Sequence, residues 1–144
     1  MFHHADLEIH QREIEGVLIL DLSGKLEMGR GDIALRDFVE TLLGQGNRKL
    51  LLDMAKVLAI DTSGSGVLLI LAQEYRAAGG RMGLFHVDRG HAKIYEMARL
   101  ESVLEVYPDE IDAVNSFFPG RTTAHYDILN YVESQHHEDP GKEK

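Results

Sequence analysis

The chain has 144 residues, of which 44% are hydrophobic and 27% charged, and this composition is typical of one ordinary globular domain. Lys and Arg number 15 against 24 Asp and Glu, and the net charge of -9 disfavours nucleic acid and anionic lipid as partners. With no cysteine, disulfides, thiolate metal sites and a cysteine nucleophile are excluded. The N-terminal sequence lacks the pattern of a secretory signal, and no apolar run approaches the roughly 20 residues that cross a bilayer. We therefore expect a cytoplasmic protein that binds neither nucleic acid nor membrane directly.

The first part of the chain predicts a hairpin, a helix and a buried strand. Residues 7–14 alternate polar and apolar, and a break at Glu15-Gly16 separates them from the apolar run 17–22, which together favour a hairpin. Apolar residues then recur at i, i+3, i+4, i+7 and i+8 over 35–43, the spacing of an amphipathic helix. The short apolar run 50–54 suits a strand buried on both faces of a sheet.

The second part of the chain alternates predicted helices and strands. We expect a helix over 63–78 ended by glycines, a strand over 82–87, a helix over 91–100 and a strand over 103–107. A last helix is marked by Ile111, Val114, Phe117 and Phe118. Strands that alternate with helices after an opening hairpin predict an α/β layer with a mixed sheet.

Common catalytic and metal-binding signatures are missing from the sequence. Neither a phosphate-binding loop, nor a dinucleotide fingerprint, nor a nucleophile elbow is matched. The eight histidines show no metal-ligand spacing, so we expect neither a metal nor a cofactor.

One segment, 61–66, carries an unusual density of polar and small residues between the buried strand and an apolar helix. It holds an acid, three hydroxyls and two glycines at a place where the free N–H groups of a helix begin. Simple capping is one interpretation, because any of the first three side chains could accept from such an N–H group. Capping needs only one acceptor, however, and each glycine costs about 1 kcal/mol relative to Ala inside a helix. The pattern therefore also favours close approach of another chain or a covalent phosphate.

Two motifs give the chain a resemblance to a known family. The run Leu22-Ser23-Gly24-Lys25-Leu26-Glu27 and the run Asp61-Thr62-Ser63-Gly64-Ser65-Gly66-Val67 resemble the STAS domain of bacterial anti-sigma factor antagonists, over roughly residues 5–118. The resemblance implies a single STAS-like α/β domain whose mixed central sheet has about four to five strands flanked by about four helices. Residues 119–144 would form a C-terminal extension, partly helical or disordered.

The resemblance also implies a function. The hydroxyl residue after the Asp is the family's phosphoacceptor, which is Thr62 here with Ser63 as the alternative. An anti-sigma factor that is also a serine-threonine kinase would bind the unphosphorylated chain, phosphorylation would end binding, and a phosphatase would reset this control of sigma-factor-dependent transcription. The chain itself would be no enzyme and need no cofactor. The expected partner-binding residues are Glu27, Asp61, Thr62, Ser63, Gly64, Ser65 and Gly66.

The resemblance and the residues leave other functions open. The chain could be the STAS subunit of a membrane transport complex. It could also be a component of a stress-sensing assembly, since Thr in place of the usual Ser also occurs in the STAS proteins of such assemblies. A small enzyme would need a base near Ser63 or Ser65. For the leading function we expect some of the helix residues 67–69 to contact the partner, and a charged residue at Gly64 to weaken binding while thermal stability stays nearly unchanged.

Overall fold

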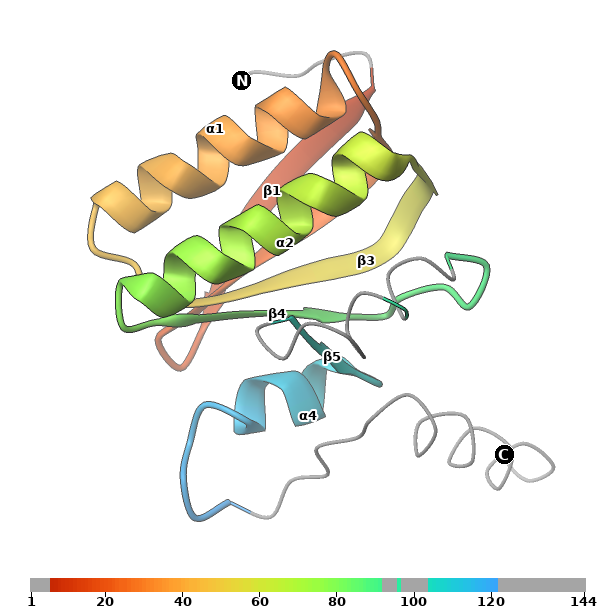
Figure 1. The fold of residues 1–144 in the computed structure, drawn as a ribbon. Coiled ribbons are helices and arrows are strands. Elements are labelled where there is room, and N and C mark those ends of the chain that lie inside the picture. Colours follow the sequence, from red (N-terminus) through yellow and green to blue (C-terminus); the bar gives the residue numbers. More distant parts are fainter. Residues whose placement is uncertain (1–5, 92–95, 97–103, 122–144) are drawn as a thin grey trace, which may run out of the picture.

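The computed structural model describes residues 6–91, 96 and 104–121, which form a mixed five-stranded sheet with helices on both faces. In the sheet order β1-β2-β3-β4-β5, β1 runs antiparallel to β2 and the remaining neighbours are parallel. Helices α1 and α2 cover one face and α4 lies on the other (Figure 1). The described elements are β1 (Leu7–Ile14), β2 (Val17–Leu26), α1 (Gly31–Gly44), β3 (Lys49–Ile60), α2 (Thr62–Ala77), β4 (Arg81–Phe85), β5 (Glu105–Tyr107) and α4 (Glu110–Asn115).

This architecture confirms the predicted α/β class and mixed sheet. Three helices lie within the described residues, against about four expected. Of the helix predicted over 91–100, only His91 and Glu96 are described, and the predictions beyond Arg121 also lie outside the described residues. The domain limits 5–118 and 119–144 stay predictions.

Two hydrophobic cores hold the layers together. The larger one lies between the sheet and helices α1 and α2, where Leu35, Leu68 and Tyr75 are fully buried. The smaller one joins Ile19, Leu51 and other residues of the opposite sheet face to Ala113 and Val114 of α4. Alternation along β1 and β2 sends their side chains to both cores, which explains why the spacing of apolar residues predicted these strands.

Strands β2 and β3 run further than the sequence predicts. We expected them to end at Leu22 and Met54, but they pair on as far as Leu26 and Ile60, with register shifts along the way. Gly24 allows β2 to continue, since its φ is +117° and a Cβ there would overlap the carbonyl oxygen of Asp6. Because Leu26 and Ile60 are paired, the loop after β2 and the start of α2 lie side by side.

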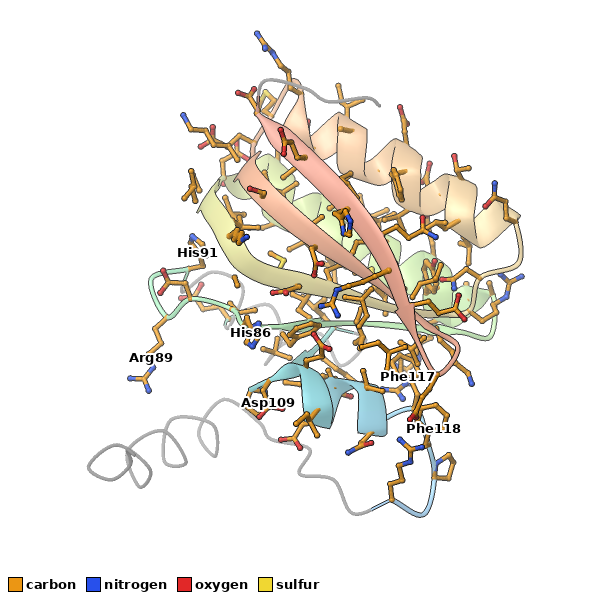
Figure 2. The ribbon with its side chains drawn as sticks, turned by 180° about the vertical axis from the view of Figure 1, so that it is seen from behind. His86, Arg89, His91, Asp109, Phe117 and Phe118 are labelled. Carbon is orange, nitrogen blue, oxygen red and sulfur yellow. The ribbon has the colours of Figure 1, made fainter. Side chains whose placement is uncertain are left out.

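The last elements are shorter than predicted. Strand β4 ends at Phe85, and the next residue, His86, has a φ of +59° that extended backbone does not adopt. In α4, Ile111 is 71% exposed rather than packed. Phe117 and Phe118 follow the helix instead of belonging to it, and they pack against the smaller core near the β1–β2 turn (Figure 2).

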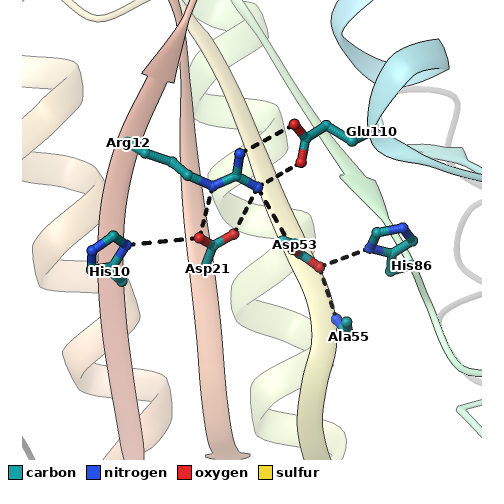
Figure 3. Close-up of polar contacts among 7 residues, drawn as sticks. All are labelled: His10, Arg12, Asp21, Asp53, Ala55, His86 and Glu110. Atoms are coloured by element: carbon teal, nitrogen blue, oxygen red, sulfur yellow. Dashed lines mark hydrogen bonds and ion pairs between the residues drawn. The ribbon is translucent and has the colours of Figure 1, made fainter.

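A polar network crosses the sheet face that α4 partly covers (Figure 3). The guanidinium of Arg12 on β1 donates to Asp21 on β2 at 2.7 and 3.0 Å and to Glu110 of α4 at 2.6 and 3.1 Å. Asp53 on β3 lies 3.8 Å from the same guanidinium and contacts His86 at 3.1 Å. Arg12 thus links three carboxylates from three elements and ties α4 to the sheet.

Replacing Arg12 with Met is expected to lower the free energy of unfolding by about 1 kcal/mol, since the arginine is 30% exposed and solvent weakens the ion pairs. Burial raises the pKa of Asp21, but the hydrogen bond and charge of Arg12 outweigh it and keep that pKa below the ordinary value. The decrease in the free energy of unfolding caused by Arg12→Met is therefore complete above about pH 4 and becomes smaller as the pH falls below that value.

Urea unfolding of both proteins at several pH values measures this difference. Arg36 offers a matched control, because it is more exposed, at 44%, and its ion pairs with Glu40 at 3.0 Å and Glu74 at 4.0 Å lie at the surface. Arg36→Met should change the free energy of unfolding by only a few tenths of a kcal/mol. A loss in Arg12→Met no larger than in Arg36→Met would show that the network does not stabilise the fold.

Candidate functional site

The candidate site lies at the end of the sheet where β2 and β3 stop, and Asp61 is its central connection. Asp61 caps α2, since its Oδ1 accepts from the backbone N–H of Gly64 at 2.8 Å. Its Oδ2 accepts from the N–H of Met28 at 2.9 Å, in the loop that follows β2. The hydrogen bonds from Met28 and Gly64 lower the pKa of Asp61, so the side chain is a carboxylate at neutral pH.

A second carboxylate, Asp32 of α1, joins the same two segments from inside. It is 7% exposed, and its Oδ1 accepts from the N–H groups of Gly29 at 3.0 Å and Ile33 at 2.7 Å. Its Oδ2 accepts from the hydroxyl of Ser63 at 2.6 Å. Asp32 was not among the predicted site residues, and its contact with Ser63 spans 31 positions of the chain.

The three hydroxyls of the segment 61–66 differ in exposure. Thr62, the first residue of α2, is exposed, Ser63 is half-buried, and Ser65 is only 4% exposed. Glu27 begins the loop after β2, and its carbonyl oxygen accepts from the N–H of Asp32 at 3.1 Å. The fold therefore brings Glu27 and the segment 61–66 to one end of the molecule, with Thr62 as its most accessible hydroxyl.

Gly64 has a packing role that the sequence analysis missed. It is buried, and a Cβ at this position would overlap the carbonyl oxygen of Leu26 and lie 2.9 Å from the Leu26 Cγ. The helix approaches β2 so closely that only glycine fits. The expectation that a charged residue at Gly64 leaves stability nearly unchanged is therefore wrong. Gly66 differs, because nothing lies within 4 Å of a Cβ placed there.

The helix residues that follow, 67–69, divide between core and surface. Val67 and Leu68 are 7% and 0% exposed and belong to the core beneath α1 and α2. Leu69 is half-buried and is the member of the run 67–69 with surface left for a contact.

Exposed apolar side chains near the site come instead from neighbouring segments. Met28 is 74% exposed in the loop held by Asp61, Ile33 is 54% exposed beside Asp32, and Leu58 is 74% exposed on β3 three residues before Asp61. Large apolar groups in water beside a polar turn are typical of an interaction surface. We call Met28, Ile33, Leu58 and the exposed Thr62 the switch surface. Met28 stands between Glu27 and Gly29-Arg30, whereas Leu58 lies within the apolar run 57–60, so local polarity could have revealed only Met28.

Two further properties concern the described part of the chain. Within it, no three His, Asp or Glu side chains are grouped so that they could hold a metal ion. Its helices are also too short or too polar for any of them to cross a membrane.

Comparison with known proteins places the chain in a family. The family model of the STAS domain matches residues 8–113, and the chain therefore belongs to the STAS domain family. Over 109 residues it is 26% identical to an anti-sigma F factor antagonist of Paenibacillus polymyxa, covering 76% of this chain and 93% of that protein.

Solved structures of anti-sigma factor antagonists share the fold. One from Mycobacterium paratuberculosis matches with a TM-score of 0.64 and 17% identity, over 77% of this chain and 93% of that one. The antagonist SpoIIAA in its unphosphorylated form matches with a TM-score of 0.61 and 16% identity, over 79% and 100% of the two chains. The phosphorylated form of SpoIIAA, from Bacillus, matches with a TM-score of 0.60 and 19% identity, over 76% and 99%.

Proposed function

We propose that this chain is an anti-sigma factor antagonist that binds an anti-sigma factor with serine-threonine kinase activity and is released when Thr62 is phosphorylated. The observation that carries the proposal is the exposure of Thr62 at the first position of α2, directly after the capping Asp61. The names of the relatives support the class of partner, and one of those relatives is known in a phosphorylated form.

The switch surface supports a protein partner for this end of the molecule. Met28 and Leu58 are each 74% exposed, and burying them would contribute most of the apolar contact. The carboxylate of Asp61 accepts from the N–H of Met28, and Thr62 follows Asp61, so both supply polar groups next to Met28. An apolar contact with polar neighbours is the usual anatomy of a reversible protein interface.

The covalent step is phosphoryl transfer from ATP that the partner binds. A bond forms between Thr62 Oγ1 and the γ-phosphorus, the bond from that phosphorus to the β-phosphate oxygen breaks, and ADP leaves. The hydroxyl proton passes to a base of the kinase or to solvent. The product carries about -1.5 to -2 charges next to Asp61 and the exposed apolar side chains, where desolvating it on rebinding is unfavourable. A phosphatase restores the hydroxyl by hydrolysis.

Affinity capture from the native cell tests the function. Wild-type protein should recover a protein that combines anti-sigma and kinase activity, and Thr62→Glu should recover little of it. Incubation of that partner with ATP and wild-type chain, followed by peptide mass spectrometry, should place one phosphate on Thr62. Phosphate confined to Ser65, or recovery of a membrane transport protein by both variants, would contradict the proposal, and the second result would favour the transport-complex alternative.

A further inference from the structure

Two adjacent hydroxyls occupy the start of α2, yet their surroundings differ sharply. Thr62 is exposed, whereas the hydroxyl of Ser63 donates to the buried carboxylate of Asp32 at 2.6 Å. Asp32 is itself fixed by two backbone N–H groups on its other oxygen, at 2.7 and 3.0 Å, so it cannot turn away from Ser63 without losing them. A short hydrogen bond to a carboxylate is among the stronger ones in proteins.

We infer that Asp32 is a positioning residue that holds the Ser63 hydroxyl out of reaction and leaves Thr62 as the single acceptor of this turn. The inference deepens the proposed function and rests on it for the identity of the reaction. Transfer to Ser63 would have to break its hydrogen bond to Asp32 and would leave a phosphate dianion against a carboxylate that is only 7% exposed. Like charges in such a poorly solvated place repel strongly.

The hydrogen bond between Ser63 and Asp32 also has the opposite chemical interpretation, and an experiment can distinguish the two. A carboxylate that accepts from a hydroxyl is also the arrangement of a general base with its nucleophile. In that case Asp32 would activate Ser63 instead of restraining it. Phosphoryl transfer depends mostly on positioning and charge stabilisation, which favours restraint of Ser63 by Asp32. Restraint and activation predict opposite changes in the reactivity of position 63 when Asp32 is replaced by an uncharged residue.

Because the chain has no cysteine, single thiols introduced at the two positions report their reactivity without a kinase. Purified Thr62→Cys and Ser63→Cys are treated with iodoacetamide at neutral pH, each alone and combined with Asp32→Asn. The charge of Asp32 disfavours the thiolate at position 63, so Ser63→Cys should react more slowly than Thr62→Cys. Adding Asp32→Asn should speed the reaction at position 63 by about fivefold or more and change it less than twofold at position 62.

Asp37→Asn is the matched control, since Asp37 is an exposed acid on the same helix, and it should leave both rates unchanged. Thermal unfolding verifies that each variant folds, and Asp32→Asn keeps an oxygen for the N–H groups of Gly29 and Ile33. The inference would be overturned if the two thiols reacted with iodoacetamide at equal rates and Asp32→Asn changed neither rate. It would also be overturned if the thiol at position 63 reacted faster than the thiol at position 62 and Asp32→Asn slowed it, because a general base acts in this way.

Phosphate mapping separates this inference from the proposed function. Wild-type chain purified from the native cell should carry phosphate on Thr62 alone, whereas Asp32→Asn should carry it on Ser63 as well. The thiol result without any phosphate on wild-type chain would refute the proposed phosphorylation and leave the restraint of Ser63 standing. Phosphate on Thr62 with no increase at Ser63 in Asp32→Asn would retain the function and overturn the role of Asp32.

Discussion

Gly64→Ala is expected to lower the free energy of unfolding by about 3 kcal/mol, or roughly 10 °C in melting temperature. The added methyl group would overlap the carbonyl oxygen of Leu26, and the paired ends of β2 and β3 leave that carbonyl little room to move. Relief would require α2 to shift away from the sheet. Because Leu68 and Leu71 of α2 are fully buried in the larger core, such a shift would also open that core.

Gly66 provides the matched control two residues along the same helix. Nothing lies within 4 Å of a Cβ at this position, so Gly66→Ala should gain up to about 1 kcal/mol from the better helix propensity of Ala. Urea or thermal unfolding of the two variants beside wild type measures both effects. Equal, small changes at the two positions would mean that the close approach of α2 to β2 is not needed for the fold.

The elements that sequence reasoning predicted well are those defined by local patterns. Alternation over 7–14 and the helical spacing of residues 35–43 each reflect which face of one element is buried, and β1 and α1 follow them. The missed parts depend on distant partners. Residues 55–60 continue β3 because Ser23 to Leu26 pair with them, whereas in the sequence Ala55-Lys56 separates the apolar run 57–60 from the predicted strand. The helix α4 has six residues, too few for spacing to fix where it ends, so Phe117 and Phe118 were wrongly expected within it.

In the candidate site, too, the sequence predicted the local segment and missed the contacts between distant residues. The segment 61–66 stood out because its residue types are unusual for one helical turn. Asp32 and Met28 reach it across 31 and 33 positions, and neither has a neighbour in sequence that points to the contact. Gly64 was recognised as unusual but was assigned to the partner, because only the fold reveals that the backbone of Leu26 lies against it.

Thr62→Glu is expected to weaken the complex with the anti-sigma kinase at least tenfold, which is about 1.4 kcal/mol or more of binding free energy. A carboxylate at the exposed first position of α2 lies beside Asp61 and next to Met28, whose N–H the same Asp61 holds. On binding, the new charge must lose water and face an existing negative charge, and interfaces discriminate by such repulsion as much as by attraction. The fold should tolerate the change, because acidic residues are favourable in the first turn of a helix.

Thr62→Ala is the matched control for Thr62→Glu, since it removes the hydroxyl without adding charge. It should bind within about threefold of wild type, and it should accept no phosphate.

Calorimetric titration of the three proteins at two salt concentrations distinguishes local desolvation from long-range charge. The net charge of -9 favours encounter with a basic partner, and salt should weaken that attraction equally in all three proteins. The penalty of Thr62→Glu comes from contact at the switch surface and should largely persist at the higher salt concentration. Binding by Thr62→Glu as tight as wild type at both salt concentrations would count decisively against release by phosphorylation.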